Sequence, residues 1–280
     1  LPAGHREALR KAFAAAAAGR WDEAQKLAAV NPLGARVLLW TQLQRGGQGF
    51  DPIASFVERN PEWPLRDTLL RRAEEALAGQ ADDAKVIAWF GDRRPATPQG
   101  TLRLAQALVA VGDTQAATRV VRDAWRLSIL GEQGERDLLA RFGAMLLPDD
   151  HAARADRLLW DRRLVDAQRV IPLLDEDRRL AARARLALAR SAADAEAGVP
   201  TAMARDPGLL YERTRLARRS GDDDRALALL RDAPRDMGRP EIWWQEREII
   251  ARRLLRDGRA AEALALVGAH GLRPEHGQDY

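Results

Sequence analysis

Three short acidic runs are the groups in this chain best suited by residue type to chemistry. They are Asp149-Asp150, which His151 follows, then Asp175-Glu176-Asp177 and Asp222-Asp223-Asp224. Closely spaced carboxylates can serve as general acid and base or can hydrolyse a glycosidic bond. Each run, however, falls where a helix is expected to begin, and acidic side chains there cap free amides and complement the helix dipole. We therefore interpret all three runs as helix caps.

Histidines and the usual catalytic motifs give no stronger candidate. His5, His151, His270 and His276 have neither the i, i+4 spacing nor a carboxylate at the spacing of metal ligands. The absence of cysteine excludes a thiol nucleophile, and the glycines of 46–49 follow an expected helix and read as a loop. The sequence thus predicts no catalytic, cofactor-binding or metal-binding residue in this chain, and no cofactor.

Tryptophan is the other residue type with a possible functional use, because sugar rings stack on indoles. Most of the eight tryptophans lie within apolar helical patterns, which favours core packing. This group is Trp21, Trp40, Trp89, Trp125 and Trp160. Trp243 and Trp244 differ, because adjacent helical positions point about 100° apart. We expect one of these two to face away from the core, at an interface or a ligand.

A recurring phrase shows which elements must position these side chains. Each copy has glycine, then polar residues, then alanine, as expected of a helix that ends in a left-handed cap before another helix begins close by. The copies are Gly19–Ala24, Gly112–Ala117, Gly221–Ala226 and Gly258–Ala263, with degenerate copies at Gly79–Ala84 and Arg163–Gln168. The spacing from Gly79 to Gly112, and from Gly221 to Gly258, is close to the roughly 34-residue period of tetratricopeptide helix pairs.

Apolar stripes at helical spacing flank these joints and predict the buried faces. The stripes run through Leu65, Leu69, Ala73 and Ala76; through Leu104, Leu108 and Val111, then Val120, Val121 and Ala124; through Leu209, Leu210, Leu216 and Ala217, then Leu227, Leu229 and Leu230; and through Ile249, Ile250, Leu254 and Leu255, then Leu264, Leu266 and Val267.

The segments between the helix pairs contain proline but are too short for flexible linkers. We predict an all-α fold, a right-handed superhelix (α-solenoid) of tetratricopeptide-like helix pairs, forming a single domain over residues 1–280. The segment from Pro274 to Tyr280 is expected to start a further helix without a capping repeat, so the natural protein is expected to continue beyond Tyr280.

Composition narrows the class of protein. Nearly half of the 280 residues are apolar, only 5% are aromatic, and no stretch approaches the length of a membrane span. All but three of the 45 basic residues are arginine, and acidic neighbours accompany them, so the net charge is only +4 and no nucleic-acid surface is expected. The start at Leu1-Pro2, without an initiator methionine, favours a mature secreted protein.

Several short motifs provide information about the family as well as about helix positions. The segment from Phe56 to Pro64, which contains Asn60-Pro61-Glu62-Trp63-Pro64 and leads into 69–77, resembles the N-terminal region of the soluble lytic murein transglycosylases. The similarity continues, in order, through 86–90, 123–126, 139–143, 151–161, 206–213 and 238–247, and so covers nearly the whole chain.

The resemblance implies a fold and a function. In that family this region is an α-superhelical, U-shaped domain that closes a ring with a linker domain and carries a lysozyme-like catalytic domain. The enzymes act in the periplasm on peptidoglycan glycan strands and leave anhydromuramyl ends. Their catalytic glutamate is followed by serine, and no glutamate of this chain is. The resemblance therefore implies the scaffold part of such a lyase, with the catalytic domain absent from this chain.

Under this hypothesis the partners are peptidoglycan strands and the parent protein's own linker and catalytic domains. Arginines that face the opening of the ring would attract the carboxylates of peptidoglycan stems. The alternative is a free-standing tetratricopeptide-like scaffold that binds a protein partner on its concave face. A concave surface rich in asparagine and lysine would favour that alternative, but both residue types are scarce here.

Overall fold

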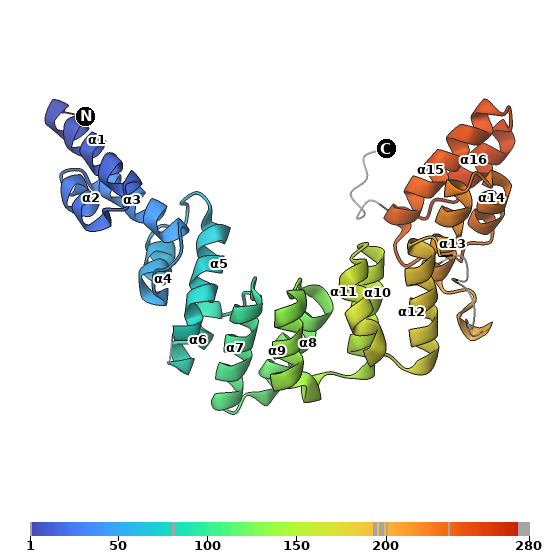
Figure 1. The fold of residues 1–280 in the computed structure, drawn as a ribbon, viewed down its shortest axis with the longest axis horizontal. Coiled ribbons are helices and arrows are strands. Elements are labelled where there is room, and N and C mark those ends of the chain that lie inside the picture. Colours follow the sequence, from blue (N-terminus) through green and yellow to red (C-terminus); the bar gives the residue numbers. More distant parts are fainter. Residues whose placement is uncertain are drawn as a thin grey trace. The chain divides into compact units, whose positions relative to one another are not determined.

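The computed structural model describes residues 2–79, 82–192, 195, 199, 201–234 and 236–273. All regular secondary structure in these residues is helical, which confirms the predicted all-α class (Figure 1). The expected helix from Pro274 to Tyr280, like His276, lies outside the described residues. None of the described helices is long and apolar enough to cross a membrane.

The chain divides into two compact units, Leu1–Met145 and Leu146–Tyr280. The first unit contains α1 (Ala3–Ala17), α2 (Trp21–Ala28), α3 (Pro32–Gln44), α4 (Phe50–Arg59), α5 (Arg66–Ala76), η1 (Leu77–Gly79), α6 (Asp83–Phe90), α7 (Pro98–Ala110), α8 (Thr114–Leu127), α9 (Gly131–Phe142) and η2 (Gly143–Met145). The second contains α10 (Pro148–Trp160), α11 (Leu164–Val170), η3 (Ile171–Leu173), α12 (Glu176–Ala189), η4 (Thr201–Met203), α13 (Pro207–Arg219), α14 (Asp223–Arg231), α15 (Pro240–Arg256) and α16 (Ala260–Gly268).

The predicted joints connect helices that pack against each other, namely α1 with α2, α7 with α8, α13 with α14 and α15 with α16. At the α7–α8 joint, Gly112 has a φ of +85°, a region in which glycine carries no steric penalty. The backbone amide of Asp113 then donates to the carbonyl of Leu108 at 2.9 Å, and the Asp113 side chain accepts from the amide of Ala116. The turn therefore ends one helix and caps the next.

The same turn forms at two places without glycine. Arg162 has a φ of +59°, and the next amide, that of Arg163, donates to the carbonyl of Leu158 at 2.9 Å. The degenerate copy at Arg163 is thus a joint, and it connects α10 to α11. Ser191, with a φ of +60°, ends α12 in the same way, and no sequence signal predicted this turn.

The structure differs from expectation at Gly79 and at four stripe residues. Gly79 ends a 3₁₀ turn, Gln80 and Ala81 lie outside the described residues, and α5 packs mainly against α4 while α6 packs mainly against α7. The exposed stripe residues share a position at a helix end or on an uncovered face, and they are Leu65, Val111, Leu255 and Leu264. Periodicity identifies a helix face, but it does not show where a neighbouring helix stops covering that face.

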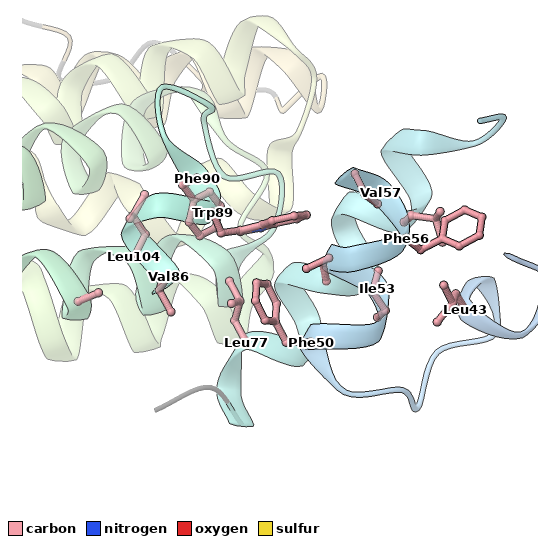
Figure 2. Close-up of a cluster of buried hydrophobic side chains, with 14 of the residues drawn as sticks. Leu43, Phe50, Ile53, Phe56, Val57, Leu77, Val86, Trp89, Phe90 and Leu104 are labelled. Carbon is pink, nitrogen blue, oxygen red and sulfur yellow. The ribbon is translucent and has the colours of Figure 1, made fainter. Parts of the chain in front are cut away.

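The core of the first unit is built mainly by α4, α5, α6 and α7 (Figure 2). Phe50 of α4 meets Trp89 of α6 edge to face, with 5.3 Å between ring centroids. Leu77 and Leu104 are buried in the same cluster. Because these residues come from separate helix pairs, the cluster joins neighbouring pairs within the unit.

Glu74 is a buried carboxylate inside this unit, with 3% of its surface exposed. Its Oε2 accepts hydrogen bonds from the amides of Ala96 and Thr97 and from the Thr97 hydroxyl, at 2.8–2.9 Å. Thr97 in turn caps α7 by accepting from the amide of Gly100, where a Cβ atom would lie only 2.4 Å from Glu74 Oε2. A negative charge from α5 therefore holds the N-terminus of α7.

In the second unit, the ring of Tyr211 contacts Trp160 in a tilted arrangement and Trp243 edge to face, with centroid separations of 5.3 and 5.5 Å. Beside them the Glu212 carboxylate of α13 accepts a 2.6 Å hydrogen bond from Arg162, which also donates to the carbonyl of Ala189 at the end of α12. The left-handed joint residue Arg162 therefore ties α10, α12 and α13 together.

The Glu74→Ala variant is expected to lower the free energy of unfolding by about 2–4 kcal/mol, because it leaves the amides of Ala96 and Thr97 and the buried Thr97 hydroxyl without their acceptor. Glu75→Ala is the matched control. Glu75 is exposed on the same helix and pairs only with Arg72 in the described structure, so its loss should change stability by less than about 0.5 kcal/mol. Urea unfolding measures both, and equal effects would contradict the role assigned to Glu74.

The pH dependence of stability tests the Glu212 site. Burial raises the pKa of the Glu212 carboxyl above its ordinary value, against the lowering effect of Arg162, Arg215 and Arg185. The native state therefore holds a proton more tightly than the unfolded chain. As pH rises from the ordinary carboxyl pKa of 4.5 to the raised native pKa, ionisation of this group lowers stability. Glu212→Gln should therefore gain stability relative to wild type as pH rises above the ordinary carboxyl pKa of 4.5 in urea titrations.

Glu262→Gln is the control of opposite sign. Hydrogen bonds from Arg259 and Arg231 lower the pKa of Glu262 to about 2, so its ionised form stabilises the fold above the ordinary carboxyl pKa. Glu262→Gln should therefore lose stability relative to wild type as pH rises from about 2 to 4.5, and keep a constant deficit above that. Differences from wild type that change over the same pH interval in both variants would contradict both assignments.

Candidate functional site

The three acidic runs lie at helix starts, as predicted. Asp150 accepts from the amide of Leu147 at the start of α10, at 2.8 Å. Asp175 and Asp222 are N-caps of α12 and α14 and accept from the amides of Arg178 and Arg225. These contacts confirm the interpretation of the acidic runs as caps.

The described histidines make different contacts. His151 is in α10, where burial lowers the pKa of its imidazole against the raising effect of Asp150. His270 accepts from the amide of Leu272 and contacts Trp244 edge to face at 6.0 Å. Within the described ranges, no group of three or more histidine and acidic side chains could hold a metal ion.

The burial of the tryptophans agrees with the sequence prediction only in part. Trp89, Trp125 and Trp160 are buried, whereas Trp21 and Trp40 are half-buried. Trp243 is fully buried and donates from Nε1 to the carbonyl of Met237, while Trp244 is partly exposed. The prediction that adjacent tryptophans face different surroundings is confirmed.

A cleft between α4 and α6 in the first unit combines an aromatic side chain with several charges. It has a volume of about 340 Å³. Phe50 and Trp89, which point toward one another in Figure 2, contribute to its wall. Lys85 lies at the cleft and pairs with Asp51 at 2.5 Å, so those two charges compensate each other.

Two arginines line the same cleft. The guanidinium carbon of Arg93 lies 4.4 Å from the centroid of the Trp89 ring, and Arg93 also donates to the Trp89 carbonyl. Burial lowers the pKa of Arg93, and the nearby charge of Arg66 lowers it further, while Glu74 and Glu58 oppose the change. Arg66 makes no hydrogen bond or ion pair with any residue that the structure describes. Its donors are therefore available to an anion.

The Asn-Pro-Glu-Trp-Pro segment forms the turn that places Arg66. Asn60 caps α4 by donating from Nδ2 to the carbonyl of Phe56 at 2.8 Å. Trp63 contacts the rings of Phe56 and Trp40 edge to face, and Trp40 donates to the carbonyl of Pro64. Leu65 then adopts a left-handed conformation, and α5 begins at Arg66.

This cleft was not predicted from the sequence, because Arg66 and Arg93 belong to unrelated stretches with ordinary composition. Its arginines and indole are residue types suited to binding an anion. Guanidinium groups bind carboxylates through paired hydrogen bonds, and the rim of an indole adds apolar contact area. Comparison of the chain with protein-family models, with curated proteins and with solved structures found no match.

Proposed function

We propose that this chain is the non-catalytic scaffold domain of a periplasmic lytic transglycosylase, which cleaves peptidoglycan glycan strands to anhydromuramyl products. The proposal rests on the ordered motifs of the resemblance and is supported by helix pairs that repeat along the chain. In this role the helices form a right-handed superhelical wall that positions the linker and catalytic domains of the parent protein.

The α4–α6 cleft is the observation that carries the proposal furthest. Peptidoglycan stems bear carboxylates, and the cleft offers Arg66 without a partner in the described structure, next to Arg93 over Trp89. Long-range attraction by such arginines raises the local concentration of an anionic polymer. The scaffold would thus hold strands as well as position the catalytic domain.

A second candidate is a free-standing scaffold for a protein partner. It is favoured by Leu255 and Leu264, which are 57% and 72% exposed on the last described helix pair. Large exposed apolar side chains are one feature of protein interfaces. A pull-down from the source cells that recovered one stoichiometric protein partner and no murein would support this candidate over the first.

Co-sedimentation of the purified chain with murein sacculi tests the first candidate. The double variant Arg66→Gln/Arg93→Gln should bind about fivefold more weakly, because it removes both arginines of the cleft and leaves only Lys85, which pairs with Asp51. Added salt should reduce wild-type binding. Arg71→Gln is the matched control, since Arg71 is exposed on the same helix and does not line the cleft. Equal binding by the double variant and wild type, at equal helicity, would contradict the role of the cleft.

The parent activity is tested with the full-length protein and purified murein. The proposal predicts release of muropeptides with anhydromuramyl ends, detected by mass spectrometry. Products with reducing ends, or no products at all, would contradict a lytic transglycosylase.

A further inference from the structure

A second cavity lies in the other unit, where α14 and α16 end. Its volume is about 400 Å³, within the range of small-molecule sites. Its lining comes from the end of α14, from the segment around Pro234 and Met237, and from the end of α16 as far as Gly271. Most of these residues are apolar, among them Leu230, Met237 and Ala265.

The charged residues that line this cavity are both cations. Arg231 pairs with Glu262 at 2.7 Å, so its charge is compensated. Arg247 of α15 is 3% exposed and has no carboxylate partner among the described residues. Burial alone lowers the pKa of its guanidinium. The cavity wall therefore carries a buried positive charge that no acidic side chain of the described residues balances.

The hydrogen bonds of Arg247 leave part of its capacity unused. Nη1 donates to the carbonyl of Leu266 at 3.0 Å, and Nη2 donates to the carbonyl of Leu230 at 3.3 Å. Nη2 also lies 3.7 Å from Sδ of Met237, while the buried Nε has no partner. The carbonyls lie at helix C-termini, whose dipoles favour a cation. These two carbonyls carry only partial negative charges, so they compensate the full charge of the guanidinium only in part. They also accept only two of its five N–H donors.

Two other buried ionic groups of this unit are paired with a side chain of opposite charge. Arg185 pairs with Asp156 at 2.5 Å, and the buried Glu246 pairs with Arg218. A buried charge without a counterion is costly, so such charges are normally paired within the protein. Arg247 departs from that pattern, and it does so at the wall of a cavity.

We propose that the α14–α16 cavity binds a small organic carboxylate. The carboxylate supplies the missing counter-charge to Arg247, and a short apolar chain lies against Leu230, Met237 and Ala265. Two sources share this chemistry, a free short-chain acid and the C-terminal carboxylate of a peptide. The inference is independent of the proposed function, because the α4–α6 cleft belongs to the other unit.

Isothermal titration of the purified chain with hexanoate tests the proposal, with hexanol and acetate as probes that lack the charge and the chain respectively. Saturable, equimolar binding of hexanoate is expected, and each control probe should bind at least about tenfold more weakly. For the second source, a short peptide ending in leucine with a free carboxylate is compared with its C-terminal amide. Tighter binding of the peptide acid than of hexanoate would assign the site to peptide ends.

Two variants locate the binding. Arg247→Met removes the charge, but it also removes two bonds to helix ends, so it can lower stability. Ala265→Leu fills the cavity from an exposed helical position and leaves Arg247 in place, so it keeps the test valid if Arg247→Met fails to fold. Both should weaken hexanoate binding at least about tenfold. The control Arg252→Gln removes an exposed arginine of the same helix and should bind as wild type.

The Nε–H resonance of Arg247 gives a readout that a purely structural arginine would not provide. Hexanoate should shift this resonance in wild type and in Arg252→Gln, and leave it unchanged in Ala265→Leu. No saturable binding, equal binding of hexanol and hexanoate, or wild-type binding by Ala265→Leu would each overturn the proposal.

Discussion

Helix ends that meet inside a packed array must still satisfy their free backbone amides and carbonyls, and this constraint organises both units. At the joints, a residue in the left-handed region lets the following amide bond back to the carbonyl five positions earlier. Away from the joints, buried charged side chains bind the free backbone groups at helix ends instead. Glu74 binds the amides that precede α7, and Arg247 binds the final carbonyls of α14 and α16. Glu74 and Arg247 are therefore buried charged side chains that satisfy backbone groups at helix ends.

The sequence was sufficient for the features that depend on local geometry. Glycine followed by polar residues located four joints, and the 100° step of a helix separated Trp243 from Trp244. Features that depend on a distant neighbour were not accessible in this way. Glu74 sits in a run of charged residues that reads as a solvated face, and only the approach of α7 makes it a buried ligand of amides. Ser191 adopts the joint conformation without a glycine to mark it.

The same distinction applies to the candidate sites. The α4–α6 cleft pairs Arg66 with Arg93 because the Asn60–Pro64 turn sets the start of α5 and because α6 ends at Phe90, beside the cleft. The α14–α16 cavity exists because α15 delivers Arg247 to the ends of two helices at once. Both sites are proposed to bind anions. The first combines arginines with an indole and with the carboxylates of Asp51 and Glu58, and the second places Arg247 and Arg231 in a mostly apolar wall. In helical arrays such surfaces can change while the helix framework remains.

The central claim is that this chain is the scaffold portion of a larger periplasmic enzyme, and the size and location of the native polypeptide test it most directly. An antibody raised against the chain would be used to blot a periplasmic extract of the source cells. The account predicts a single periplasmic band at about twice the 31.0 kDa of this chain or above. A band at 31.0 kDa, or a band confined to the cytoplasmic fraction, would contradict it.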